Sequence, residues 1–221
     1  MKIRSILFAT LGVAVMASCG GKVSDVTKIS GTVVPEGISE VNIVVGELVD
    51  TLVPVVDGKF YIELPADITT IATISAADYG TSFIPDGTPL TVVLDEETKI
   101  TSAYPEISVN EKLVAFNETS EAYVEKYRST QQEIRDAEDK TEQEKEQALN
   151  EFYESFFAEY KEYNVKTYTE NTDNFVALYA LQGLMGEFED PELDSLLNLL
   201  VPALQEHKFV QGMQKAIKAR I

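Results

Sequence analysis

The sequence predicts an α+β protein, with a small antiparallel β-sandwich followed by an α-helical subdomain. Two observations support this fold class. Between residues 28 and 104 the chain is rich in Val, Ile and Thr, and turn signals recur roughly every eight to twelve residues, as in small sandwiches. After Pro105 the apolar residues recur instead at spacings of three and four, which is the period of a helix. We therefore expect a sandwich domain at residues 28–105 and a helical subdomain at residues 106–221.

Turn chemistry divides the first half into strands. Asp57-Gly58 lies between two β-prone runs and supplies the positive φ angles that a type I′ hairpin turn requires. Pro35-Glu36-Gly37 and Pro85-Asp86-Gly87 predict further turns, because proline presets φ and glycine tolerates unusual values. The strands are expected at residues 27–34, 41–45, 51–56, 59–64, 69–76, 88–94 and 98–103.

Capping signals divide the second half into five helices. Ser108-x-x-Glu111 and Thr141-x-x-Glu144 both match the capping box, in which the hydroxyl and the carboxylate each accept from a free backbone N–H. Asp190-Pro191 predicts another start, with Asp190 as the cap. The expected apolar faces are Val109, Leu113, Phe116, Tyr123 and Tyr127; Leu149, Phe152, Phe156, Tyr160 and Tyr163; Phe175, Leu178, Leu181 and Leu184; Leu193, Leu196, Leu197 and Leu200; and, in a last helix from about Pro202, Phe209, Met213 and Ile217.

The N-terminus has the pattern of a secretory signal. Lys2 and Arg4 precede an uncharged apolar run at residues 6–16, which is too short to span a bilayer. Ala17 and Ser18 then lead into Cys19, and this arrangement resembles the bacterial lipobox, although Met16 stands where that motif more often has Leu. The alternative is a chance cysteine in an ordinary signal sequence. The lipobox interpretation predicts a signal peptide at residues 1–18, lipidation of Cys19 and a flexible tether at residues 19–27.

This interpretation also predicts where the protein acts. Two or three acyl chains on Cys19 would anchor the mature chain to a membrane of the cell envelope. Gly20-Gly21-Lys22 follows in place of the acidic run found in surface-exported lipoproteins, which favours an anchor facing the periplasm. Because Cys19 is the only cysteine, lipid on its sulfur would leave no free thiol in the chain.

Composition and motifs narrow the range of functions. A formal net charge of −19 argues against nucleic acid as a partner, because its phosphates would be repelled. No Gly-x-Ser-x-Gly, phosphate-binding loop or HExxH motif occurs, and the single histidine, His207, is interpreted as a solvent-exposed helix residue. We interpret the acidic residues between Glu187 and Asp194 as helix N-terminal charges and not as a calcium site. We therefore predict no catalytic residue, no cofactor and no metal site.

Six aromatic residues on the second predicted helix are the candidate binding residues. They fall on more than one face of the helix, so one interpretation is a groove for a peptide or a partner domain. The other interpretation, which we favour, is that this helix packs on two sides, against the sandwich and against neighbouring helices. The residues are Phe152, Tyr153, Phe156, Phe157, Tyr160 and Tyr163.

The order of these parts resembles a known bacterial family. A lipobox is followed by "VVDGKFYIEL" and "FIPDGTPLTVVLD", then by "SVNEKLVAFNE" and "LVPALQEHKFVQGMQKAIKAR". This order is similar to the N-terminal region of thioredoxin-like lipoproteins of the TlpA/ResA type, a β domain of unknown function with a helical linker. The family's redox site is a tryptophan-flanked Cys-x-x-Cys in a C-terminal thioredoxin fold. This sequence has neither a tryptophan nor a second cysteine, so it is expected to be either a fragment or a stand-alone relative.

The resemblance implies a non-catalytic role. It points to an N-terminal positioning and partner-binding module of a thiol–disulfide oxidoreductase system, with a thioredoxin-like domain or exported proteins as partners. The alternative is a stand-alone envelope lipoprotein that acts as a binding or structural module with no redox role.

Overall fold

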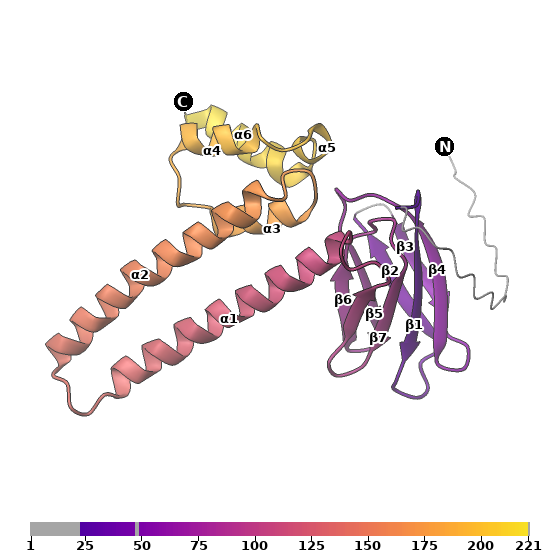
Figure 1. The fold of residues 1–221 in the computed structure, drawn as a ribbon, viewed down its shortest axis with the longest axis horizontal. Helices are drawn as coiled ribbons and strands as arrows, with labels where there is room; N and C mark the ends of the chain where they lie inside the picture. The colour runs from indigo at the N-terminus through magenta and orange to yellow at the C-terminus, as the bar shows by residue number, and fades with distance from the viewer. Residues whose placement is uncertain (1–22, 47–48, 221) are drawn as a thin grey trace.

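The computed structural model describes residues 23–46 and 49–220, and it confirms the predicted α+β class (Figure 1). Two four-stranded sheets face each other, and the helices follow them in the chain. Cys19 and the predicted signal lie outside the described residues. One sheet has the order β4 (Lys59–Pro65), β1 (Val26–Val33), β7 (Leu90–Leu94), β8 (Lys99–Ser102), and the other has the order β3 (Val49–Pro54), β2 (Glu40–Val45), β5 (Ala72–Ala76), β6 (Tyr79–Phe83).

Alternation along the strands builds the sandwich core. In β1 the side chains of Thr27, Ile29 and Val33 are buried, whereas Lys28 and Ser30 face solvent. The β1 strand begins at Val26, so the last two residues of the predicted tether belong to the sheet. One pairing departs from the antiparallel expectation, because β1 pairs with β7 in parallel. Parallel strands need a crossover connection, and here the second sheet lies between them in the chain.

The predicted turn at Asp57-Gly58 is confirmed. Both residues have positive φ, 51° and 71°, and Val56 and Lys59 exchange backbone hydrogen bonds across the turn. The strands on either side belong to different sheets, so this turn carries the chain from one sheet to the other.

One strand was missed. We predicted a strand at residues 69–76 and the next one only at residue 88, whereas β5 and β6 form a hairpin through Ala77 and Asp78. Ala77 has a φ of 50°, a left-handed value that usually calls for Gly or Asn. The turn contains neither residue, and Asp78 alone is too weak a turn signal to divide the predicted strand.

Helices form the second half, and two of them make a long antiparallel hairpin. Both α1 and α2 have 28 residues, which corresponds to about 42 Å each at the helical rise. The last predicted helix is in fact two helices. At the start of the second of these, the His207 Nδ1 accepts a hydrogen bond from the Phe209 N–H. The second half therefore contains six helices where five were predicted. The helices are α1 (Val109–Asp136), α2 (Glu142–Thr169), α3 (Val176–Gly183), α4 (Asp190–Leu197), α5 (Pro202–Gln205) and α6 (Lys208–Arg220).

The helix caps agree only in part with the prediction. Thr141 and Glu144 form the complete capping box at the start of α2. Ser108 caps α1, but Glu111 accepts from the Ser102 N–H instead of reaching back to Ser108. At α4 the cap is Glu189, and Asp190 lies inside the helix.

The described residues form two apolar cores. One lies between the two sheets, and the other joins α3–α6 to the adjoining ends of α1 and α2. No helix among the described residues is long and apolar enough to cross a membrane.

Candidate functional site: the aromatic arm

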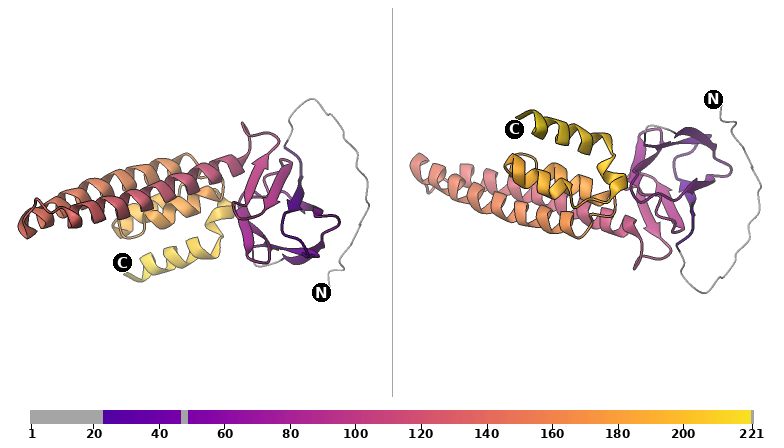
Figure 2. Two further views of the ribbon diagram at one scale, coloured as in Figure 1. Left: turned by 90° about the horizontal axis from the view of Figure 1, so that it is seen from below. Right: turned by 90° about the horizontal axis from the view of Figure 1, so that it is seen from above.

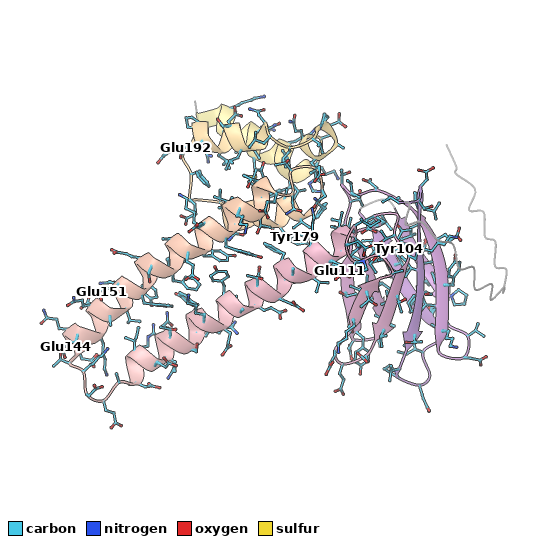
Figure 3. All side chains as sticks on the ribbon, viewed as in Figure 1. Tyr104, Glu111, Glu144, Glu151, Tyr179 and Glu192 are labelled. Atoms are coloured by element: carbon cyan, nitrogen blue, oxygen red, sulfur yellow. The ribbon has the colours of Figure 1, made fainter. Side chains whose placement is uncertain are left out.

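The α1–α2 hairpin divides into two parts that we name here. The arm is residues 120–136 of α1 with residues 142–160 of α2, and the base is the rest of both helices with α3–α6. Both views in Figure 2 show the tip of the hairpin extending beyond α3–α6. Figure 3 shows Tyr179 at the base between α3 and α1, and Glu144 and Glu151 towards the far end of the arm.

Stacked aromatic rings hold the two helices of the arm together. The Tyr123 ring of α1 lies 5.8 Å from the ring of Phe156 and 5.2 Å from that of Tyr160, both at steep angles. One turn further out, the Tyr127 ring lies 5.3 Å from Phe156 and 5.8 Å from Tyr153. Such tilted and edge-on contacts are favourable for aromatic pairs and add to the burial of their area.

The six aromatic residues singled out from the sequence differ in exposure. Phe156 is 6% exposed at the centre of the stack, whereas Phe157 remains 47% exposed. The other four are half-buried, and Phe152, Tyr153 and Tyr160 join Phe156 in ring contacts with α1. Tyr163 stacks on Phe116 in the base, with 6.0 Å between ring centroids.

One side of the arm carries an uncovered apolar strip, which we call the aromatic edge: Val124, Tyr127, Tyr153 and Phe157. Val124 is 48% exposed on α1, similar to Phe157 on α2. The Phe157 ring lies 6.3 Å from Tyr127 and 6.4 Å from Tyr153. The Gln131 side-chain amide donates to the Tyr153 hydroxyl at 2.7 Å and links the two helices beside the strip.

The aromatic edge continues a face that is covered in the base. Along α2, Tyr153, Phe157, Asn164 and Tyr168 follow one another at spacings of four, seven and four, so they share one side of the helix. Asn164 and Tyr168 are fully buried. At Asn164 the end of α3 comes so close that a Cβ on Gly183 would lie 2.6 Å from its Oδ1 atom. Beyond this point α3 ends, and the same side of α2 is exposed.

A buried polar joint connects the sandwich to α1. Asp86 is 3% exposed, and its Oδ2 atom accepts from the Ser108 hydroxyl at 2.6 Å and from the Val109 N–H at 2.8 Å. Its Oδ1 atom accepts from the backbone and the hydroxyl of Thr88. The Asn110 side chain bonds both the N–H and the carbonyl of Ile84 at 2.7 Å, as a neighbouring strand would. The sequence predicts only a turn at Asp86 and does not reveal this role, because its partners at the start of α1 are more than twenty residues away.

The arm is strongly acidic. Its residues include ten Asp and Glu against four Lys and Arg. Lys126 forms one inter-helix ion pair, to Glu159, at 2.6 Å. Burial raises the pKa of the nearby Tyr123, and the negative charge of Glu159 raises it further. The summed charge would attract cationic partners and repel acidic ones.

The remaining predicted residues lie in the base. His207 is half-buried and packs edge-on against Phe175 at 5.5 Å, so the prediction of an exposed histidine was wrong. In the acidic run, Glu189 and Glu192 cap α4, and Asp190 makes a two-pronged ion pair with Arg220. Among the described residues no group of three His, Cys, Asp or Glu side chains is arranged to hold a metal ion.

We compared the chain with models of protein families, with curated proteins and with solved structures, and none of them matches it.

Proposed function

We propose that this chain is a lipid-anchored protein of the cell envelope, in which the arm binds a protein partner and the sandwich positions the arm. The observation that carries this proposal is the aromatic edge. Val124 and Phe157 are about half exposed on a helix pair whose same face is covered in the base. An uncovered apolar strip along the side of a projecting element is typical of a contact site for another protein.

The resemblance described above provides the partner class. In this proposal the partner belongs to a thiol–disulfide exchange system, as a thioredoxin-like domain or an exported substrate protein. The charge of the arm favours a partner surface that is apolar at its centre and basic around it. The same charge disfavours a second copy, because the ten carboxylates and four cations of one arm would face an equal excess of negative charge on the other. The alternative function is a stand-alone binding or structural lipoprotein with no redox role.

Photo-crosslinking in intact cells tests the role of the arm. A photoreactive amino acid would replace Phe157 in one strain and, as a matched control, Leu199 of the base, which is 56% exposed, in another. We expect a discrete adduct from position 157 only, formed with a protein that carries a basic surface, and its loss on Tyr127→Ser. An adduct of twice the chain's mass would identify a second copy and contradict the proposal. Equal adducts at both positions, or none, would also contradict it.

The intact mass of the native protein, purified from its own membrane, tests the anchor and the redox link. A mass equal to lipidated residues 19–221 supports the stand-alone lipoprotein. A mass larger by a whole domain, with two titratable thiols, supports the thiol–disulfide system. A mass without lipid would contradict the anchor under either alternative.

A further inference from the structure

The chain is fixed to the sandwich almost as soon as its described part begins. The Ser24 N–H donates to the Gly87 carbonyl at 3.1 Å, and β1 starts two residues later. Gly87 has a φ of +80°, and a Cβ at this position would lie 2.2 Å from the Ser24 carbonyl oxygen and 2.7 Å from the Val23 side chain. Residues 23 and 24 are therefore packed directly on the Pro85–Gly87 turn.

This turn belongs to the same end of the sandwich as the joint with α1. We call it the α1 end; it comprises residues 24–26, 65–67, 84–90 and 102–108. The Ala66 N–H donates to the Asp25 carbonyl and the Ala103 N–H to the Pro89 carbonyl, so these segments adjoin one another. The opposite end, where β1 stops near Val34, lies about 26 Å away along the strand. In Figure 1, α1 starts at the α1 end and runs away from the sandwich.

The geometry points to the α1 end as the surface that faces the lipid bilayer. This inference rests on the proposed lipidation of Cys19. Four residue steps separate Cys19 from Val23, and a fully extended chain covers about 14 Å in that length. The acyl chains enter the bilayer at Cys19, so the Pro85–Gly87 turn cannot move further from the membrane surface than the length of the chain between Cys19 and Val23 allows. The opposite end of the sandwich is too distant to share the contact.

The surface at this end fits lipid headgroups better than the hydrocarbon interior. Asp25, Asp67 and Glu106 are exposed there, together with two apolar side chains, Ile107 at 43% and the adjoining Val23 at 58%. Carboxylates do not enter the hydrocarbon, and they are repelled by anionic lipids. We therefore expect the α1 end to lie against zwitterionic headgroups and to be held further off by an anionic surface.

Distance-dependent quenching tests this orientation. Lipid on Cys19 would leave no other thiol in residues 19–221, so a protein of these residues with one introduced cysteine carries a single fluorophore. The probe is a phosphatidylcholine vesicle that contains lipids with a quencher on the headgroup. Ile107→Cys and Glu106→Cys report on the α1 end, and Val34→Cys, 61% exposed at the opposite end, is the matched control. We expect at least a twofold stronger quenching at positions 106 and 107 than at position 34.

Two further variants test whether the short tether sets this orientation. Twelve Gly and Ser residues inserted after Lys22 lengthen the tether and should reduce the difference between the two ends to less than half. Gly87→Ala should act in the same direction, because residues 23–25 would be displaced from the turn and would join the tether. The insertion lies outside the folded part, so it remains informative if Gly87→Ala unfolds.

Equal quenching at both ends, or a difference that the insertion does not change, would overturn the inference. Stronger quenching on vesicles with anionic lipid would overturn the choice of zwitterionic headgroups. Failure of the lipid anchor has a separate signature: the protein would not sediment with vesicles, and its intact mass would contain no lipid.

Discussion

The base and the arm share the two long helices α1 and α2, but the side chains of these helices are buried to different extents in the two parts. In the base, α3 packs on the hairpin and buries Asn164 and Tyr168 completely. In the arm only Phe156 is buried, and the rings that hold the helices together remain half exposed. Two helices alone bury only the narrow seam between them, so the packing of a third element determines where the hairpin is rigid and where it can open.

The largest expected difference comes from truncating one leucine in each part. Leu181 is fully buried in the base, so Leu181→Ala should lower the free energy of unfolding by about 2–5 kcal/mol. Leu149 is half-buried near the tip, so Leu149→Ala should lower it by about 1 kcal/mol or less. Urea unfolding of both variants measures the contrast. Equal losses would mean that the arm is as integral to the fold as the base.

The next largest loss of stability is expected from a substitution in the polar joint between the sandwich and α1. Asp86→Asn places an amide group among five donors to the carboxylate, and we expect a loss of about 2–4 kcal/mol. The matched control is Asp67→Asn, because Asp67 accepts from Thr69 and Thr70 in a similar turn but is exposed. Its loss should be below about 1 kcal/mol. Comparable losses for the two variants would show that the joint does not depend on the buried charge.

Local signals in the sequence were sufficient for most elements of the fold. The Asp57-Gly58 turn, the Thr141–Glu144 capping box and the apolar stripes of the long helices depend on residues a few positions apart. The β6 strand was missed because the turn before it adopts a positive φ at Ala77 without a glycine.

Local signals were not sufficient to predict the candidate site. Helical spacing brings Phe156 and Phe157 to adjacent faces, but it does not reveal that α3 ends at Gly183 and leaves one of those faces uncovered. The role of Asp86 depends on partners brought close by the fold. Exposure is a property of the whole chain, and for that reason the division into base and arm is visible only in three dimensions.

Replacing two helix glycines with alanine should change the stability of the protein in opposite directions. A Cβ at Gly183 would lie 2.6 Å from the buried Asn164 Oδ1, so Gly183→Ala should destabilise the base by about 1–3 kcal/mol. Gly212 in α6 has open space around it, so Gly212→Ala should stabilise the helix by about 0.5–1 kcal/mol. Thermal unfolding of the two variants should show melting temperatures on either side of the parent. A neutral Gly183→Ala would show that α3 can shift along α2.

Alkaline pH should weaken the base through Tyr168. Burial raises the pKa of Tyr168 above its ordinary value of 10.0. The unfolded state therefore loses this proton first, and the stabilisation that is present below pH 10 declines as the pH rises above it. Tyr168→Phe should lose about 1 kcal/mol at pH 8, where the hydroxyl donates to the Leu196 carbonyl. Its stability should then fall less steeply than that of the parent between pH 10 and 11. Equal slopes in urea unfolding would exclude Tyr168 as a source of the alkaline sensitivity.

The smallest effect is expected at the tip of the arm, and it distinguishes local from global stability. Thr141→Ala removes the capping box of α2, which stabilises the first turn by about 1 kcal/mol. If the arm opens without the base, the loss should appear as faster hydrogen exchange near residues 142–146 while the urea midpoint stays unchanged. Ser129→Ala, at a half-buried position in the same arm, is the control, because its hydroxyl donates to carbonyls of its own helix. A full shift of the urea midpoint by Thr141→Ala would mean that arm and base unfold as one unit, and the arm would then contact its partner as a rigid element.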